Sequence, residues 1–283
     1  MSCFGRNKSL RERYGNWALI TGASSGIGRS LALQIAAENV NLVLVARGKA
    51  NLDQTAQDVK AVNASVEVRV VSADLSNRDS INQIIQAVAD IEIGLLIPNA
   101  AIEDHGFFML SDAEKQDKLI EMDCYAPMRL AHHFGKLMVQ RRKGGILFVS
   151  SLSGWGGQPY MAHYGAAKAY ILTLGEGLYH EMRGSGIDVT VLSPGPTKTP
   201  MISDLPIDFA KLGMAVMSPD DVARYALKRL GKSAHAIPGM RNRVMQNMMS
   251  KTMTRNFAGR MMRMMLRKQL KLPNQPWDAL PVS

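Results

Sequence analysis

Short apolar runs alternate with amphipathic stretches through roughly the first 200 residues, and this alternation limits the possible folds more than any other feature. The apolar runs are rich in Val, Ile and Leu without regular polar positions, which is typical of strands buried on both faces. The strand-like runs are Trp17 to Thr21, Leu42 to Val45, Val66 to Val71, Leu95 to Ile97, Ile146 to Ser150 and Val189 to Ser193. The helical patterns are Ile27 to Glu38, Leu52 to Val62, Ser80 to Ala89, Ala113 to Arg142 and Ala166 to Arg183. This order predicts an α/β fold with a doubly wound parallel sheet that helices cover on both faces.

The chain divides into one large domain and two flanking segments. Residues 1–13 are basic, and we expect a solvated tail there. The domain is expected over residues 14–239, and it ends with a helix from Ser218 to about Gly231 and a short strand that closes the sheet. Residues 240–283 form a C-terminal extension.

Composition excludes several classes of protein. Apolar residues make up 46% of the chain and charged residues 20%, which excludes an intrinsically disordered protein. Two cysteines, Cys3 and Cys124, are too few for a disulfide scaffold of 283 residues. No window approaches 18 consecutive apolar residues, and the N-terminus lacks the apolar core of a secretory signal. We therefore expect a cytoplasmic protein without a membrane-spanning helix.

The positive charge of the chain is concentrated in the C-terminal extension. The formal net charge is +10, and nine basic residues with no acidic one lie between Arg241 and Leu272, which leaves +1 for the rest of the chain. An apolar row with a spacing of four runs through this segment, formed by Met245, Met249, Met253, Phe257, Met261 and Met265. The pattern predicts a basic amphipathic helix, which suits an anionic membrane surface through residues 240–272 or packing against its own domain or a second subunit. A basic stripe alone does not indicate nucleic-acid binding.

The first strand leads directly into a glycine-rich loop and then a helix. Glycines permit a tight turn and let backbone N–H groups approach a pyrophosphate at the positive end of that helix. A glycine cluster alone is often only a loop, but the strand before it and the helix after it favour a dinucleotide site. The candidate pyrophosphate-binding residues are Gly22, Ser24, Ser25, Gly26, Ile27 and Gly28.

The end of the second strand indicates which dinucleotide binds. An acidic residue there would bind the ribose 2′-hydroxyl of NAD, whereas this chain has Ala46, Arg47 and, two residues later, Lys49. A guanidinium fits a 2′-phosphate, so the sequence favours NADP(H); the alternative is that Arg47 is an ordinary exposed arginine. After the third strand, Asp74 and Leu75 stand where a carboxylate would accept a hydrogen bond from an adenine amino group.

Tyr164 and Lys168 are four residues apart near the start of a predicted helix, so their side chains share one face. A nearby ammonium, together with the positive charge of an oxidised nicotinamide, favours the phenolate and lowers the pKa of tyrosine from about 10. Such a tyrosine gives a proton to a carbonyl oxygen or takes one from an alcohol. Ser151, thirteen residues earlier at the end of a strand, supplies a hydroxyl that would polarise the same carbonyl.

Together these residues resemble the short-chain dehydrogenase/reductase family. The matching positions are Thr21 to Gly28, Asp74-Leu75, Asn99-Ala100, Ser150-Ser151, Tyr164 with Lys168, and Pro194-Gly195. The resemblance covers about residues 14 to 235, and the Ala46-Arg47 pair is similar to that of NADPH-dependent ketoreductases and hydroxysteroid dehydrogenases. It implies a seven-stranded Rossmann fold that forms homodimers or homotetramers through the long helices after strands four and five.

The resemblance also implies roles for individual residues. Tyr164 would be the acid/base, Ser151 would orient the substrate, and Lys168 would lower the tyrosine pKa and bind the nicotinamide ribose. Further cofactor contacts would come from Asn99, Ala100, Pro194, Gly195, Thr197 and Thr199. A mobile substrate loop would span about residues 200–217. A lipophilic substrate is indicated by Met201, Ile202, Leu205, Ile207 and Phe209 in that loop, and by Trp155, Tyr160 and Met161.

Two positions depart from the family pattern. Asn-Asn-Ala-Gly appears here as Pro98-Asn99-Ala100-Ala101, and the last of these changes adds one methyl group to the expected cofactor wall. Asp123 stands where the family has an asparagine that holds a proton-relay water, and we count it among the catalytic candidates. Its charge would pair with Lys168 and weaken the effect of the ammonium on Tyr164. Histidines 132, 133 and 163 form no metal-binding pattern, so no metal is expected.

The sequence therefore predicts an NADP(H)-dependent oxidoreductase that acts on a lipophilic carbonyl or alcohol. Steroid-like and 3-oxoacyl substrates both remain open. The alternative function is an NADPH-binding scaffold or sensor with attenuated turnover that acts through the C-terminal extension; Asp123 and that extension motivate it. The expected location is the cytoplasm, with peripheral attachment to a membrane as a further option.

Overall fold

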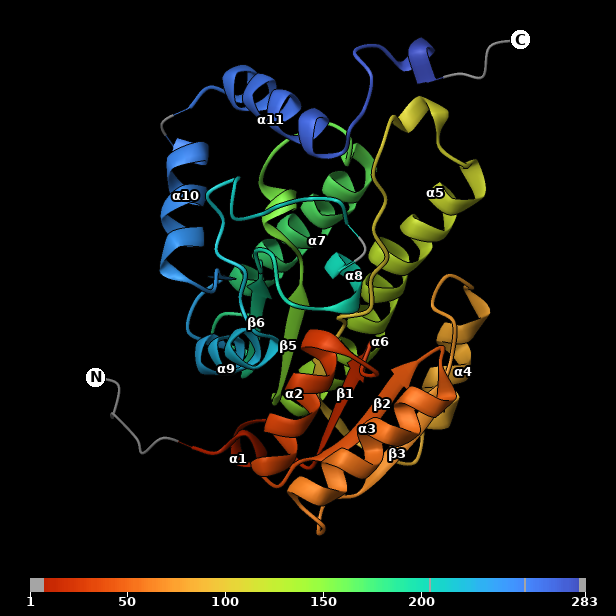
Figure 1. Ribbon diagram of the computed structural model, residues 1–283. Coiled ribbons are helices and arrows are strands. Elements are labelled where there is room, and N and C mark those ends of the chain that lie inside the picture. Colours follow the sequence, from red (N-terminus) through yellow and green to blue (C-terminus); the bar gives the residue numbers. More distant parts are fainter. Residues whose placement is uncertain (1–7, 204, 252, 280–283) are drawn as a thin grey trace.

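The computed structural model describes residues 8–203, 205–251 and 253–279, which form an α/β domain around one parallel sheet (Figure 1). The strands are β1 (Trp17–Thr21), β2 (Asn41–Ala46), β3 (Val68–Ser72), β4 (Ile93–Ile97), β5 (Gly144–Val149), β6 (Ile187–Leu192) and β7 (His235–Ala236). Their order across the sheet is β3-β2-β1-β4-β5-β6-β7, and all neighbours are parallel. The chain thus winds outward from β1 in two opposite directions, which confirms the seven-stranded Rossmann sheet.

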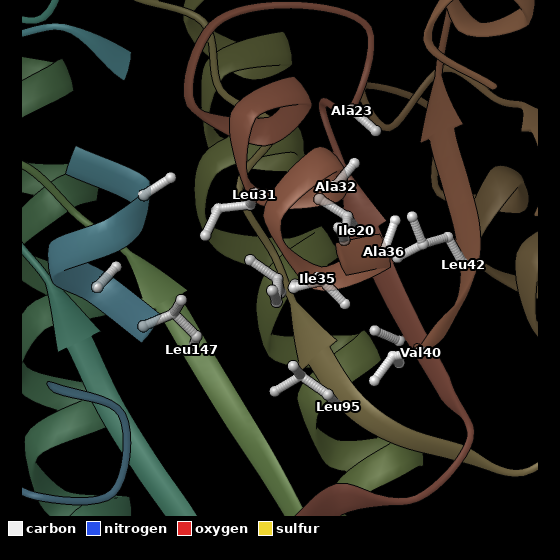
Figure 2. Packing of buried hydrophobic residues seen from close by; sticks show 14 of the residues in the cluster. Ile20, Ala23, Leu31, Ala32, Ile35, Ala36, Val40, Leu42, Leu95 and Leu147 are labelled. Atoms are coloured by element: carbon white, nitrogen blue, oxygen red, sulfur yellow. The ribbon is translucent and has the colours of Figure 1, made fainter. Parts of the chain in front are cut away.

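Helices cover both faces of this sheet. On one face lie α2 (Gly26–Ala37), α3 (Lys49–Val62) and α9 (Pro219–Arg229), and on the other lie α4 (Asp79–Ala87), α6 (Ala126–Arg141) and α7 (Ala162–Glu181). Successive strand residues point to opposite faces, so Ile20 of β1 packs in the first core and Leu19 in the second. In Figure 2, Ile35 of α2 lies near Ile20 of β1 and Leu95 of β4, and Leu147 of the next strand, β5, lies beside the blue helix, α9.

The N-terminal boundary lies earlier than residue 14. Residues 1–7, with Cys3 and Arg6, are outside the described part of the chain, but α1 (Leu10–Tyr14) belongs to the domain. The Ser9 side chain caps α1 by accepting the Glu12 N–H at 3.3 Å, and Leu10 and Tyr14 are buried. The Tyr14 hydroxyl donates to Asp188 Oδ2 of β6 at 2.9 Å. Residues 9–13 are therefore not a solvated tail, because their apolar and capping side chains fasten them to the core.

The helix expected over Ala113 to Arg142 is interrupted at Asp123. After α5 (Ala113–Ile120) comes a π-helical turn, η2 (Glu121–Tyr125), and α6 begins only at Ala126. Pro127 has no backbone N–H, and in a regular helix its ring would clash with the Asp123 carbonyl four residues earlier. The Ala126 N–H reaches back five residues to the Glu121 carbonyl instead. A proline inside a helical pattern was the sequence signal for this wider turn, and such turns are frequent at functional sites.

The C-terminal extension forms two helices rather than one continuous amphipathic helix. α10 (Met240–Lys251) ends before Thr254, whose side chain accepts the Phe257 N–H at 3.3 Å and caps α11 (Arg255–Gln269). The expected apolar row is therefore divided between two helices that start and stop independently (Figure 1). A short helix, η4 (Pro276–Ala279), follows, and residues 280–283 lie outside the described chain.

Both helices of the extension pack against their own domain. Asn242 of α10 is fully buried, and its side chain accepts the Ala215 N–H at 2.9 Å and donates to the Ala215 carbonyl at 3.0 Å. On α11, Leu266 packs in a cluster with Tyr160 and Ile207. The sequence left three partners open for this segment: a membrane surface, a second subunit and its own domain. These contacts show packing against its own domain. Within the described ranges, no helix has the length and hydropathy to cross a membrane.

Candidate active site

A cavity of about 470 Å³ opens at the carboxyl ends of the strands. Its lining comes from the segments that follow β1 to β6, from α7 and from α11. Parallel sheets of this type bind ligands at this edge, where the winding direction changes. Most predicted site residues line it: Gly22, Ser24, Ser25, Gly26, Ile27, Arg47, Leu75, Asn99, Ala100, Ser151, Tyr164, Lys168, Pro194, Gly195, Thr197 and Thr199. Gly28, Asp74 and Asp123 were also predicted, and they lie outside the lining.

The loop between β1 and α2 has the geometry of a diphosphate cradle. Gly22 and Gly26 have positive φ angles of 65° and 53°, which residues with side chains rarely adopt. A Cβ on Gly28 would lie 2.2 Å from the Gly22 carbonyl oxygen, so this close approach needs glycine. The Ser25 side chain makes no capping hydrogen bond, so the first N–H groups of α2 face the loop at the positive end of the helix. The cradle therefore fits the pyrophosphate of a dinucleotide.

Asn99 and Ala100 hold this cradle against the end of β4. Asn99 Nδ2 donates to the Thr21 carbonyl at 2.9 Å, and the Asn99 and Ala100 N–H groups both donate to the Thr21 hydroxyl at 2.9 Å. A Cβ on Gly22 would come within 2.9 Å of the Ala100 Cα. These contacts give both residues a positioning role, while their direct contact with a cofactor stays a prediction.

The end of β2 offers one basic group to the cavity. Arg47 lines it and is exposed, whereas Lys49 Nζ lies 2.8 Å from Asp53 Oδ2 in an ion pair. Asp74 does not line the cavity; its Oδ1 accepts hydrogen bonds from the Ser76 N–H at 3.0 Å and the Ser76 hydroxyl at 2.8 Å. In these contacts Asp74 stabilises the turn after β3, and its role in adenine recognition stays a prediction.

Tyr164, Lys168 and Ser151 converge, as their spacing predicts. Tyr164 and Lys168 lie in the first turns of α7 and are buried. Lys168 Nζ lies 5.6 Å from the centre of the Tyr164 ring, and the Ser151 side chain is close enough to the Tyr164 phenol to lower its pKa. The Ser150 hydroxyl donates to the Lys168 carbonyl at 2.7 Å and fastens α7 to the end of β5. A phenol and a hydroxyl therefore meet at one point of the cavity wall.

Asp123 forms the ion pair with Lys168 that its charge suggests. Lys168 Nζ lies 2.9 Å from Asp123 Oδ2, and the two residues are 2% and 1% exposed. The other carboxylate oxygen, Oδ1, accepts the Ile102 N–H at 2.9 Å. Burial by itself would lower the pKa of Lys168, but the charges of Asp123 and Tyr164 raise that pKa above its ordinary value. The ammonium is therefore retained inside the protein.

The pKa of Tyr164 is raised, whereas a lysine neighbour alone would lower it. Burial is the main cause; Lys168 opposes it, the charge of Asp123 adds to it, and the hydrogen bond with Ser151 opposes it again. The sequence prediction of a lowered pKa considered Lys168 and an oxidised nicotinamide together; in the protein without cofactor, burial disfavours the phenolate, and the prediction for the complex stays a prediction. At neutral pH the side chain is consequently a phenol that has a proton to give.

The loop over residues 200–217 lines the cavity, as expected. A parallel bridge between Thr197 and Met217 closes its base, and α8 (Pro200–Ser203) opens it; residue 204 lies outside the described chain. The predicted apolar residues of this loop all face the cavity: Met201, Ile202, Leu205, Ile207 and Phe209. Met161 lines it too, but the prediction was wrong for Trp155, which packs on His235, and for Tyr160, which packs beneath the loop.

Several cavity residues were not identified from the sequence. Glu103 and Gln158 line the cavity from two loops, and Met262 and Leu266 line it from α11. Leu266 and Leu270 of the extension are four residues apart, so they share one helix face. This spacing was a sequence signal for the buried face of the extension. In the part of the chain that is described, no group of three or more His, Cys, Asp or Glu side chains is placed to hold a metal ion.

Comparison with known sequences places these features in context. The profile of the short chain dehydrogenase family matches residues 16–208. A 7beta-hydroxysteroid dehydrogenase of Clostridium sardiniense is 32% identical over 236 residues, which are 83% of this chain and 90% of that protein. A very-long-chain 3-oxoacyl-CoA reductase of Pyricularia oryzae is 31% identical over 190 residues, which are 65% of this chain and 57% of that protein.

Solved structures are similar over most of the chain. A structure from work on 7beta-hydroxysteroid dehydrogenase stereoselectivity has a TM-score of 0.84 at 30% identity, and the match covers 90% of this chain and 99% of the other. A short-chain dehydrogenase from Sphingobium yanoikuyae in complex with NADPH has a TM-score of 0.73 at 32% identity, with 83% of this chain and 96% of the other covered.

Proposed function

Because this chain belongs to the short-chain dehydrogenase family, it is an oxidoreductase, and we propose that it uses NADP(H) to reduce a carbonyl group, or oxidise an alcohol, on a lipophilic molecule. The proposal depends above all on one observation: the Tyr164 phenol and the Ser151 hydroxyl meet in a cavity that also contains the glycine cradle. The Sphingobium relative is in complex with NADPH, which supports this cofactor. One relative is named a hydroxysteroid dehydrogenase and another a very-long-chain 3-oxoacyl-CoA reductase. Steroid-like and 3-oxoacyl substrates are therefore both candidates.

The residues of the cavity divide the work of such a reaction. NADPH, when bound, supplies the hydride that reaches the carbonyl carbon. Ser151 holds the carbonyl oxygen by a hydrogen bond, and Tyr164 donates its proton to that oxygen as the alcohol forms. The Lys168 ammonium stabilises the phenolate that remains on Tyr164. In the direction of oxidation, the phenolate accepts the proton of the alcohol.

The apolar wall of the cavity supports a lipophilic substrate. The loop after β6 and the helix α11 both contribute apolar side chains, among them Phe209 and Met262. Such side chains exclude water from the reacting groups, and their contact with an apolar molecule stabilises its binding.

The second candidate function is an NADPH-binding scaffold or sensor with attenuated turnover. The charge of Asp123, which adds to the raised pKa of Tyr164, favours it because a phenolate is then harder to form. A screen of lipophilic ketones with NADPH and NADH, and of alcohols with the oxidised cofactors, separates the two candidates. Turnover that depends on Tyr164 supports the enzyme, and tight NADPH binding without such turnover supports the scaffold.

Arg47 is expected to set the preference for NADPH over NADH. In Arg47→Ala the affinity for NADPH should fall about 10- to 100-fold, the usual contribution of a charge-assisted hydrogen bond, while the affinity for NADH changes far less. Cofactor fluorescence titrations measure both dissociation constants. Lys49→Ala is the matched control, because Lys49 already pairs with Asp53 at 2.8 Å. An unchanged ratio of the two constants in Arg47→Ala would refute phosphate recognition by this arginine.

Asp123→Asn is expected to move the pH profile of alcohol oxidation to lower pH. The carboxylate helps to raise the pKa of Tyr164, so its removal lowers that pKa and the phenolate needed for oxidation forms at lower pH. The displacement should be about one pH unit, the low end of the shifts that a neighbouring charge causes. The readout is kcat for oxidation across the alkaline range, with Asp53→Asn as the control. An unchanged profile would mean that Asp123 is not coupled to Tyr164.

Membrane attachment, oligomer formation and a cytoplasmic location stay predictions. Met240 and Val244 of α10 and Phe257 and Met264 of α11 are exposed among basic residues, which supports contact with an anionic membrane. Leu137 of α6 and Tyr170 of α7 are exposed side chains on the two helices through which we expect contact with a second copy of the chain.

A further inference from the structure

Two buried side-chain oxygens in the cavity have no hydrogen-bond partner within the described ranges of the chain. They are Glu103 Oε2 and Gln158 Oε1, and both residues line the cavity. The Glu103 side chain is only 15% exposed, and its other oxygen lies 3.4 Å from His105 Nδ1. A buried acceptor without a donor is unfavourable, so a ligand that brings donors into this cavity would stabilise both atoms.

Asp104, the residue after Glu103, has hydrogen-bond donors for both of its carboxylate oxygens. Asp104 Oδ1 lies 2.5 Å from Lys115 Nζ, and Asp104 Oδ2 accepts from Gln116 Nε2 at 2.6 Å. Both oxygens of that carboxylate are therefore satisfied by α5. Glu103 differs because it lines the cavity and its Oε2 has no such partner.

The two loops that carry the free acceptors are fastened to each other. The Gly106 N–H donates to the Tyr160 carbonyl at 2.7 Å, and the rings of Phe107 and Tyr160 meet edge to face with centres 5.5 Å apart. The Ile102 N–H, next to Glu103, is held by the buried Asp123. Glu103 and Gln158 therefore belong to one fixed part of the wall, and a ligand meets acceptors that are already positioned.

The cavity that contains these acceptors also has apolar side chains in its wall and contains Tyr164. Met161, Ile207 and Met262 line the same cavity and have no donor to offer. The charge of Glu103 is also a minor cause of the raised pKa of Tyr164, after burial, Lys168, Asp123 and Ser151. Burial also raises the pKa of Glu103 itself, and His105 opposes that effect.

We propose that Glu103, together with Gln158, forms a polar subsite that binds a hydrogen-bond donor on the substrate, separate from the reacting carbonyl or alcohol. The inference rests on the proposed function, because it names the substrate class of the same cavity. The substrate is then a bulky ketone or alcohol with a second donor group, which is a hydroxyl or an ammonium. A carboxylate at this position is repelled by Glu103.

Matched ketones test this subsite in the full-length protein with NADPH. Four probes share one fused-ring skeleton and one ketone, and they carry at the far ring a hydrogen, a hydroxyl, an amine or a carboxylate. In the wild type, kcat/KM should be about 10- to 100-fold higher for the better of the hydroxyl and amine probes than for the parent ketone, the range for a hydrogen bond to a charged group. The carboxylate probe should be the poorest. The ranking of hydroxyl against amine shows which donor the subsite takes.

Glu103→Leu should invert this preference. The hydroxyl or amine probe loses its partner, so its kcat/KM falls about 10- to 100-fold, while that of the parent ketone rises because an apolar group replaces an unpaired carboxylate. Glu103→Gln keeps an acceptor oxygen and should retain a preference for the hydroxyl probe. Glu38→Leu is the matched control, because Glu38 is an exposed glutamate directly after α2. This variant should keep the wild-type ranking of the four probes. The thermal midpoint of Glu103→Leu should not fall below that of the wild type. If Glu103 had only a structural role, its replacement would lower the midpoint.

Calorimetric titrations of the same skeletons without the ketone keep the subsite testable apart from turnover. If no ketone is reduced but the hydroxyl or amine skeleton still binds better than the parent in a Glu103-dependent way, the proposed reaction fails and the subsite stands. If the parent ketone is reduced and the donor probes show no advantage, the subsite is wrong and the proposed reaction stands. A donor advantage that persists in Glu103→Leu also refutes it.

Discussion

Tyr164→Phe should lose about 10³-fold in kcat/KM for ketone reduction, because general acid catalysis by a positioned side chain contributes on that order. The substitution removes one hydroxyl and keeps the ring, which packs in a small cluster with Leu119, Cys124 and Ala167. Folding should therefore be preserved, and NADPH affinity should fall far less than turnover. Steady-state kinetics with the best ketone of the screen and fluorescence titration with NADPH measure the two effects separately.

Tyr170→Phe is the control for this change. Tyr170 lies on the same helix, α7, but is 43% exposed and outside the cavity lining. It should behave as the wild type in both measurements. Turnover by Tyr164→Phe at a rate near that of the wild type would show that another group supplies the proton, and the assignment of Tyr164 would then be wrong.

Lys168→Met should destabilise the protein by about 3–5 kcal/mol, the usual effect of removing one partner of a buried ion pair. The substitution leaves the Asp123 carboxylate, which is 1% exposed, without its counterion. It also removes the ammonium that lowers the pKa of Tyr164, so the phenolate fraction falls about tenfold for each unit by which that pKa rises. Urea unfolding gives the free energy, and the rate of alcohol oxidation at neutral pH gives the second effect.

A double variant separates the two consequences. In Lys168→Met with Asp123→Asn, both members of the pair are neutral, and the amide oxygen of asparagine can still accept the Ile102 N–H that Asp123 holds at 2.9 Å. The unfolding free energy should recover most of the loss, but oxidation should not recover, because the ammonium is still absent. If Lys168→Met alone is as stable as the wild type, Asp123 and Lys168 do not depend on each other.

The C-terminal extension contributes to the cavity as well as to the surface. Leu266 of α11 is buried and lines the cavity, and Asn242 of α10 holds the loop at Ala215. A Cβ on Gly195 would lie 2.6 Å from Asn242 Nδ2, so the extension also packs against the Pro194-Gly195 turn. The basic, exposed sides of the same helices remain available to a membrane or a partner. One segment therefore has a buried side that shapes the site and an exposed side that carries charge.

Local patterns predicted the elements of this site well. The glycine positions of the cradle follow from a strand, a tight turn and a helix in direct succession, and these constraints act within a few residues. The spacing of Tyr164 and Lys168 puts both on one helix face by the geometry of the helix alone. The effect of burial on the pKa of Tyr164 was not considered from the sequence, because burial depends on all the chain packed around the phenol. The continuous C-terminal helix was wrong, because Thr254 caps a new helix.

The amino-acid sequence by itself determined the order of strands and helices, the cradle and the residues able to exchange a proton. Periodicity and turn chemistry act over a few residues, so they can be read without knowing what lies across the domain. Only the tertiary structure decided that Asp123 and Lys168 are both almost fully buried, that Glu103 and Gln158 share one cavity, and that α11 closes its wall. A helical pattern specifies which face is apolar, but the partner of that face, and the burial that sets each charge, depend on contacts between segments far apart in the chain.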